Sequence, residues 1–113
     1  MDLTREEALK LHRQMWTDMQ EELGDNPDGE DREEYKADWC RGHGFNDVKH
    51  NCFLCEYSYR KSPHFCKHCP VKWPTRNGIC IDNVSDDESP LRGDYYQTAP
   101  IREIIALPER EDV

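Results

Sequence analysis

Two Cys-x-x-Cys pairs, Cys52/Cys55 and Cys66/Cys69, are separated by ten residues in the middle of the chain. Both sulfurs of such a pair can reach one point, and two pairs supply the tetrahedral set of four thiolates that Zn²⁺ favours. The spacing therefore predicts a structural zinc site bound by Cys52, Cys55, Cys66 and Cys69. Iron–sulfur ligation is a minor rival, and two disulfides would need a secreted chain, for which no targeting signal is present. A thioredoxin-like redox pair is disfavoured because two matched pairs fit one closed metal site better.

The composition indicates why such a chain needs a metal. Of its 113 residues, 35% are apolar, a group that includes the six cysteines, and another 35% are charged. So little apolar surface struggles to offset the conformational entropy that a domain of this size loses on folding. Small domains of this kind commonly gain the missing stability from a metal or from disulfides.

A site closed by four thiolates has no open coordination position, whereas catalytic zinc needs one for water or substrate. We therefore expect a structural metal and no enzyme activity. The catalytic alternative is an HNH-type nuclease, which uses a histidine as general base beside a catalytic metal. No further metal ligand at a suitable helical spacing accompanies the residues that this alternative would use, which are Asp38, His43, His50, Asn51 and His68.

Cys40 and Cys80 stand outside the two pairs. Each is interpreted either as a small buried core residue or as part of a second metal site. In that second site they would act together with nearby histidines, and the candidates are His43, His50, His64 and His68. No spacing among these residues identifies such a site.

A helix is predicted at the start of the chain. Thr4 is a natural N-cap, Glu7 completes a capping box, and Gly24 ends the helix after Leu23. A stripe of mostly apolar side chains recurs at helical spacing between these ends, namely Ala8, Leu9, Leu11, His12, Met15, Trp16, Met19 and Leu23. We expect this stripe to face the core, and the alternative is a surface for a partner or for a second copy of the chain.

The predicted fold is one small α+β domain over residues 1–113. Its centre is expected to resemble a zinc knuckle or zinc ribbon, with an N-terminal amphipathic helix and a short C-terminal helix around it. The C-terminal helix is predicted from Pro100 in its first turn, from an apolar face of isoleucines and from Pro108 as its end. In chain order the parts are the first helix (1–23), an acidic loop (24–34), the zinc-binding centre (35–81) and a second acidic loop with the C-terminal helix (82–113).

Charge is distributed unevenly along these parts. Residues 1–34 carry 4 basic and 12 acidic side chains, a net charge of -8. Residues 35–81 carry 8 basic and 3 acidic side chains, or +5, and residues 82–113 carry 3 basic and 9 acidic ones, or -6. Four thiolates and one Zn²⁺ together add -2, which leaves the centre at +3. The arms therefore favour a basic partner, although they also fit simple solubilising surfaces.

Nucleic-acid binding is the alternative function, and it would have to use the basic centre as a zinc-ribbon-like module. Aromatic side chains at Tyr57, Tyr59 or Trp73 would then stack on bases. The phosphate contacts would come from Lys49, Arg60, Lys61, Lys67, Lys72 and Arg76. A net charge of +3 is small for such a footprint, and the alternative interpretation of the same cations is that they offset the charge of the thiolates.

Several motifs resemble those of a family of small, largely uncharacterised proteins encoded by tailed bacteriophages. They are "CFLCEY" from Cys52, "CKHCPVKW" from Cys66, Cys80, Ser89-Pro90 and the closing "LPER", Leu107 to Arg110. The resemblance implies a zinc-binding protein that acts inside an infected bacterium. Small phage proteins often bind and redirect a host protein, so it also implies an inhibitor or modulator of a host factor.

The compartment expected from the sequence is a reducing cytoplasm. The opening "MDLTREEALK" is acidic and polar, unlike a signal peptide, and no stretch of 18 or more apolar residues is present. Paired cysteines in a reducing cytosol bind metal more often than they form disulfides. We thus expect a cytoplasmic, zinc-stabilised protein whose acidic arms bind a host protein with a basic surface.

Overall fold

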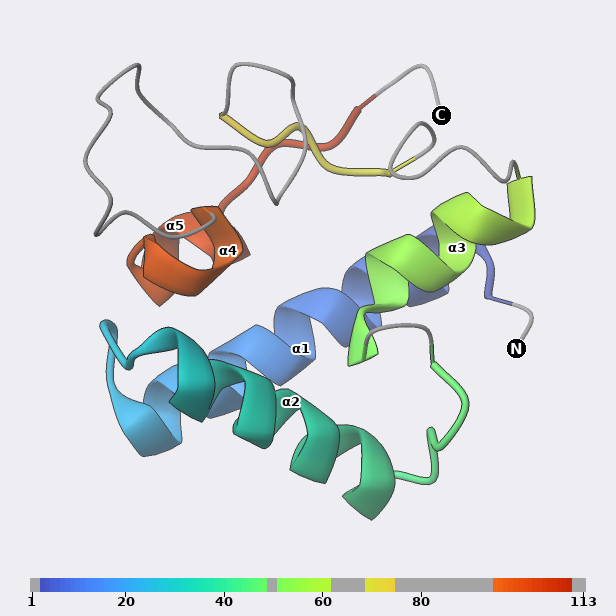
Figure 1. Cartoon of the computed structure of the whole chain (residues 1–113). Helices are drawn as coiled ribbons and strands as arrows, with labels where there is room; N and C mark the ends of the chain where they lie inside the picture. Colours follow the sequence, from blue (N-terminus) through green and yellow to red (C-terminus); the bar gives the residue numbers. More distant parts are fainter. Residues whose placement is uncertain (1–2, 49–50, 62–68, 75–94, 111–113) are drawn as a thin grey trace.

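The computed structural model describes residues 3–48, 51–61, 69–74 and 95–110, and helices dominate this part of the chain (Figure 1). In chain order they are α1 (Arg5–Leu23), α2 (Gly29–Gly42), α3 (Phe53–Lys61), α4 (Tyr95–Thr98) and α5 (Ile101–Ile105). Within the described residues there is no sheet, only an isolated antiparallel bridge between Val71 and Glu109. None of the described helices is both long and apolar enough to cross a bilayer.

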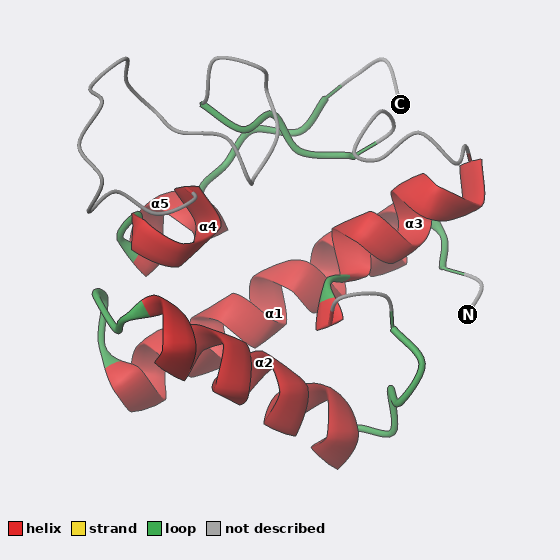
Figure 2. Cartoon of the chain, viewed as in Figure 1, coloured by secondary structure: helices red, strands yellow, loops and turns green. Residues whose placement is uncertain are grey.

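The prediction of an α+β fold with a zinc-knuckle or zinc-ribbon centre is therefore wrong (Figure 2). The physical reason lies in the residues after Cys52. We expected a tight turn there, but Phe53, Leu54 and Tyr57 are all buried on one side of a helix. Their spacing suits a helical face, and the contact of α3 with α1 supplies the packing that stabilises it.

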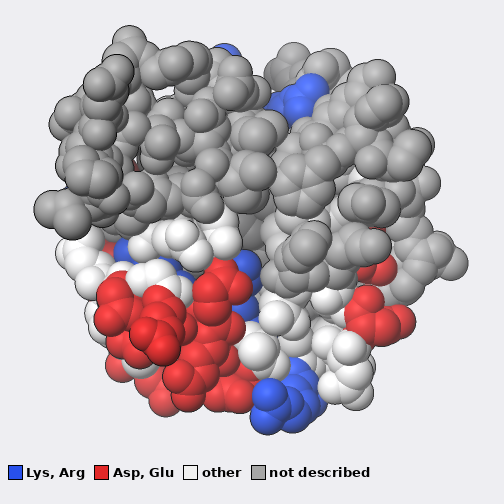
Figure 3. All heavy atoms as spheres, viewed as in Figure 1, with Lys and Arg blue, Asp and Glu red and all other residues white. Residues whose placement is uncertain are grey.

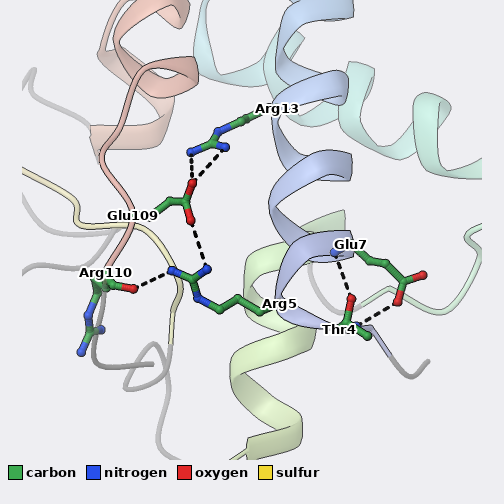
Figure 4. Close-up of polar contacts among 6 residues, drawn as sticks. All are labelled: Thr4, Arg5, Glu7, Arg13, Glu109 and Arg110. Carbon is green, nitrogen blue, oxygen red and sulfur yellow. Dashed lines mark hydrogen bonds and ion pairs between the residues drawn. The ribbon is translucent and has the colours of Figure 1, made fainter.

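The first helix is confirmed where the sequence predicted it. The Thr4 side chain accepts a hydrogen bond from the Glu7 N–H at 3.1 Å, and the Glu7 side chain accepts one from the Thr4 N–H at 3.0 Å (Figure 4). Gly24 follows the last turn with φ +87°, a conformation that side chains other than glycine rarely adopt. The buried residues of α1 are Ala8, Leu9, His12, Met15, Trp16 and Met19.

The predicted acidic loop over 24–34 is wrong in its second half, because α2 already begins at Gly29. Asp28 caps this helix, and its side chain accepts a hydrogen bond from the Asp31 N–H at 2.8 Å. Glu30 and Asp31 lie in the first turn, where carboxylates interact favourably with the positive end of the helix dipole. The helix ends at Gly42, and His43 follows as its C-cap.

The longest helix, α1, lies at the centre of the described structure. It packs against α2, α3 and α5, while α2 also contacts α4 (Figure 1). One hydrophobic cluster draws on all these contacts and on the 69–74 segment as well. Its members include Met15, Trp16, Phe53, Val71 and Ile104.

The short C-terminal helix is also confirmed, with Pro100 at its N-cap and Ile101 and Ile104 buried. Its position depends on Asp25, in the connection between α1 and α2. The Asp25 carbonyl accepts from the Ile101 N–H at 2.8 Å, and its carboxylate accepts from the Arg102 N–H at 2.8 Å and pairs with the Arg102 guanidinium. These contacts dock α5 onto the end of α1.

The closing Leu107–Arg110 segment lies beside the 69–74 segment (Figure 1). The Lys72 N–H donates to the Pro108 carbonyl and the Arg110 N–H donates to the Pro70 carbonyl, both at 2.8 Å. Glu109 binds two arginines of α1, Arg5 at 3.0 Å and Arg13 at 3.4 Å (Figure 4). The chain around Cys69 is thereby attached to α1 through the C-terminal segment.

Candidate metal centre and acidic region

The first cysteine pair lies at the start of α3. Cys52 immediately precedes the helix, Cys55 lies in its first turn, and the Cys55 N–H donates to Cys52 Sγ at 3.3 Å. Sulfur thus takes the place of the oxygen that usually caps a helix. The positive end of the helix dipole favours a thiolate at this position.

The second pair is described only at Cys69, because Cys66 lies outside the described residues. Cys69 is buried, and its Sγ accepts a hydrogen bond from the Trp73 indole N–H at 3.4 Å. Its carbonyl accepts one from the Arg110 guanidinium at 3.4 Å. Cys69 belongs to the hydrophobic cluster, and half-buried Cys52 packs against this cluster.

Within the described part of the chain, no three potential ligands come close enough to hold one metal ion. The four-cysteine site therefore remains a prediction that these residues alone do not test. The chemistry of the donors is compatible with zinc, because one sulfur in each pair already accepts an N–H donor, as zinc-bound thiolates commonly do. Cys52, Cys55, Cys66 and Cys69 would be the ligands.

Cys40 is buried in α2, as one of its two interpretations requires. Burial raises the pKa of the Cys40 thiol, nearby Lys36 lowers it, and Cys52 raises it further. The rings of Trp39 in α2 and Phe53 in α3 are 5.7 Å apart between their centres, so the end of α2 lies near the start of α3, which the sequence did not indicate. Cys80 lies outside the described residues, as do His50, His64 and His68.

The described residues of the nuclease alternative do not form a catalytic set. Asp38 pairs with Arg41 on its own helix at 3.5 Å, and both side chains are exposed. The His43 ring stacks on Trp39 with 3.9 Å between the ring centres, and its Nδ1 lies 2.8 Å from the Trp39 carbonyl oxygen. Asn51 has a positive φ of 52° just before Cys52.

His12 is a buried polar residue whose environment the sequence did not predict. Its ring makes edge contacts with the rings of Trp16 and Trp73, with 6.4 and 6.2 Å between the ring centres, and His12 is only 2% exposed. Its Nε2 has no hydrogen-bond partner. Burial, aided by the positive charges of Lys36 and Arg13, lowers the pKa of His12 to about 3, although a hydrogen bond with the Ile104 backbone raises it.

A region of negative charge covers the end of α1 and the start of α2, and we call residues 18–38 the acidic region (Figure 3). It contains ten carboxylates and two cations. Seven of the carboxylates are exposed, namely Glu21, Glu22, Asp28, Glu30, Asp31, Glu34 and Asp38. The negative charge of this sequence thus faces the solvent.

Both cations of the acidic region are buried. The Arg32 side chain is 1% exposed and donates to the carbonyls of Pro27 at 2.9 Å and Tyr96 at 3.1 Å. Lys36 is 5% exposed, lies 4.8 Å from the centre of the Tyr96 ring and pairs with Glu33 at 3.6 Å. These cations attach α4 to α2 and leave the exposed charge of the region wholly acidic.

Burial and the negative charge of this region both act on Tyr35, a tyrosine within it. Burial raises the pKa of Tyr35 to about 12, with contributions from Glu22, Asp18 and Glu21 and from a hydrogen bond to Glu22. Negative charge close to a phenol disfavours the phenolate, so the direction of the shift agrees with the charge map. An anion approaching this surface would meet the same potential.

No family model, curated protein or solved structure matches the chain. The resemblance to small phage proteins therefore stays a prediction.

Proposed function

We propose that this chain is a zinc-stabilised, non-enzymatic module that binds a protein with a basic surface through the acidic region. The observation that carries the proposal is the burial of Arg32 and Lys36, the two cations of residues 18–38. Because both are buried among groups of the same chain, the charged groups that this region presents to a partner are all carboxylates. Binding of a host protein as a phage-encoded inhibitor or modulator is the biological role that we propose for it.

Electrostatic complementarity acts mainly on the rate of encounter and on the choice of partner. A surface of one sign steers an oppositely charged partner, and this steering weakens as salt screens the charges. Duplex DNA and RNA carry dense negative charge, so the acidic region would repel them. A basic protein surface, including one that normally holds nucleic acid, would be attracted.

The proposed metal has a structural task in this scheme. Zinc held by Cys52, Cys55, Cys66 and Cys69 would join the start of α3 to the segment that contains Cys69. When bound, zinc supplies folding free energy, and a site with four protein ligands keeps no position for a substrate. We propose a reducing cytoplasm as the place of action, because the thiols must remain reduced to bind the ion.

Nucleic-acid binding through the basic centre is the rival function. Among its proposed phosphate contacts the structure describes the side chain of Lys72, which is exposed. The side chains of Lys49, Arg60, Lys61, Lys67 and Arg76 lie outside the described residues. No described contact favours this function, so it enters as an outcome of the test.

The test compares two double variants. Glu30→Gln with Glu34→Gln removes two exposed charges from the acidic region. The matched control, Glu6→Gln with Glu103→Gln, removes two exposed charges elsewhere. Tagged wild-type protein captures its partner from bacterial lysate, and association rates with the identified partner are then measured at low and at physiological salt.

The acidic-region variant should associate several-fold more slowly at low salt, the difference should shrink at physiological salt, and the control should match the wild type. Equal association rates for both variants would contradict the docking surface. Sub-micromolar binding of labelled nucleic acid at physiological salt, abolished by Lys61→Glu with Lys67→Glu, would establish the rival function instead.

A further inference from the structure

Residues 101–110, which end the described part of the chain, pack along α1, and we call them the C-terminal strap (Figure 1). Ion pairs hold both of its ends. Near the end of α1, the Asp25 carboxylate accepts from the Arg102 N–H at 2.8 Å and pairs with the Arg102 guanidinium. Near the start of α1, Arg5 pairs with Glu109 at 3.0 Å (Figure 4). The strap therefore follows α1 from its last turn back to its first.

The middle of the strap contacts His12 of α1. The ring forms a hydrogen bond with the Ile104 backbone and makes an edge contact with Trp73, and the residue is 2% exposed. No described group pairs with the ring Nε2. A neutral ring suits this position, because its unprotonated nitrogen is only an acceptor. A second proton would place a full charge and an unpaired N–H in the core, which is costly.

The charged groups around His12 make a second proton still less favourable. They are Lys36 of α2 and Arg13 of α1, both cations, and no carboxylate of the described residues acts on the ring. Burial first, and then these two cations, lower the pKa of His12 to about 3. The closed strap thus excludes the protonated ring. Once the strap has left α1, the ring meets water and returns toward its ordinary pKa of about 6.5.

We propose that the C-terminal strap is an acid-released latch: a proton taken up by the His12 ring frees the strap from α1 while α2 stays packed on α1. The carboxylates at the ends of the strap supply little of this response between pH 7.5 and pH 5, because ordinary carboxyl pKa values lie near about 4. The hydrogen bond from the Arg102 backbone lowers the pKa of Asp25 further. The latch goes beyond the proposed function and uses neither the proposed metal nor a partner.

The release can be local because α2 has its own contacts with α1. The Trp39 indole N–H donates to Asp18 at 2.9 Å, and the Lys36 ammonium lies 6.0 Å from the centre of the Trp16 ring. The strap in turn covers little besides its own apolar residues and the middle of α1. At neutral pH it stays closed, because opening would expose the isoleucines of α5, which are fully buried.

The size of the response follows from proton linkage. Between pH 7.5 and pH 5 the ring of the open form becomes almost fully protonated, while the ring of the closed form stays neutral. The equilibrium constant for strap opening should therefore rise by up to about 30-fold. The cations near the ring still act on it in the open form and reduce this factor, so the rise expected is between about threefold and about 30-fold.

Amide hydrogen exchange measured by NMR tests the latch. Two N–H groups report on it directly: that of Ile101 donates to the Asp25 carbonyl and that of Lys72 donates to the Pro108 carbonyl, both at 2.8 Å. Exchange rates at pH 7.5 and pH 5, corrected for the intrinsic rate at each pH, give the opening constants. A series at low urea concentration separates local opening, which changes little with urea, from global unfolding, which the amides in the middle of α2 report.

In the wild type both reporter amides should show the predicted rise at pH 5 and little dependence on urea. His12→Phe cannot bind a proton, so its opening constants should agree within about twofold at the two pH values. If His12→Phe does not fold, His12→Asn keeps a side chain that can bond to the Ile104 backbone and should give the same result. His43→Gln is the matched control: it removes an exposed histidine and should keep the wild-type rise.

Glu109→Gln separates the end of the strap from its middle. It weakens the pair with Arg5, so it should raise the opening constant by a similar factor at both pH values and leave their ratio unchanged. A wild-type rise below about threefold, or an equal rise in the His12 variants, would refute the role of His12. Reporter amides that are as protected and as urea-dependent as those of α2 would show that the strap opens only with the whole chain, which would refute the latch.

Discussion

Acidification should destabilise this protein through His12, well before its carboxylates titrate. The pKa of His12 is about 3 in the folded chain against an ordinary value of 6.5, because burial disfavours the charged ring. Between these two values the unfolded chain binds a proton that the folded chain does not. Stability is therefore fully present above pH 6.5 and is lost as the pH falls, by about 1.4 kcal/mol per pH unit once the pH is well below 6.5.

The magnitude can be worked out for an accessible interval. Between pH 7.5 and pH 5 the unfolded histidine becomes almost fully protonated, while the folded one stays neutral, which lowers the unfolding free energy by about 2 kcal/mol. Carboxylates contribute little in this range because their ordinary pKa values lie near 4. Protonation would also place a positive ring between two tryptophans with Lys36 and Arg13 nearby, so the folded state does not readily accommodate it.

His12→Phe isolates this effect, because the new ring fills most of the same space and cannot bind a proton. Urea unfolding of both proteins at pH 7.5 and pH 5 gives the measurement. The variant is expected to be less stable than the wild type at pH 7.5, because it lacks the hydrogen bond to the Ile104 backbone. At pH 5 the difference in unfolding free energy between the two proteins should shift by about 2 kcal/mol in favour of the variant. Other histidines and the thiols are common to both proteins and cancel. An equal change of stability with pH in the two proteins would refute the argument.

Three further pairs of substitutions test the capping of α1, the burial of Arg32 and the backbone conformation at Gly24. Thr4→Ala removes the capping side chain of α1 and should lower the free energy of urea unfolding by about 1 kcal/mol, while Thr4→Ser should stay close to the wild type. An unchanged unfolding midpoint for Thr4→Ala would show that the capping box contributes nothing. Arg32→Met breaks two hydrogen bonds of a buried side chain and should lower the unfolding free energy by about 3 kcal/mol. Arg41→Met breaks only an exposed ion pair and should lower it by less than about 0.5 kcal/mol. Similar decreases for the two variants would contradict the role of burial. Gly24→Ala should lower stability by about 1 kcal/mol or more, because φ at this position is +87°. Gly42→Ala should raise stability by up to about 1 kcal/mol, because Gly42 is helical and has open space around it. Thermal melts that place both variants on the same side of the wild type would argue against the backbone explanation.

Local signals in the sequence were sufficient to predict α1. Thr4, Glu7 and Gly24 mark its ends, and the apolar stripe between them faces the core except at its last member, Leu23, which is exposed. The C-terminal helix was predicted for the same reason, from Pro100 and its isoleucines. In both cases the signals lie within the element or directly beside it, so a single stretch of sequence was enough to predict a helix. The contacts of Asp25 that dock α5 come from a distant part of the chain and were not predicted.

Helix α2 was missed because long-range contacts bury its charged side chains. Arg32 and Lys36 belong to its buried face. Arg32 lies in the 24–34 stretch, whose composition suggested an acidic loop, and Lys36 lies in the predicted zinc-binding centre. Their aliphatic stems can cover apolar surface, while the charged groups meet Tyr96, which lies far away in the sequence. The cysteine spacing drew attention to ligand chemistry at α3 and concealed the helix that begins there. The zinc prediction itself remains open, since Cys66 lies outside the described residues.

The contact between Glu109 and Arg5 joins residues 104 positions apart. During synthesis on a ribosome, at about 5–20 residues per second, α1 would emerge seconds before the residues that cover it from α3, α5 and the C-terminal segment. Its apolar stripe, with Met15, Trp16 and Met19, would stay uncovered for that time. A nascent chain of this kind is a natural client for a chaperone at the ribosomal exit, and its yield in cells should depend on that protection.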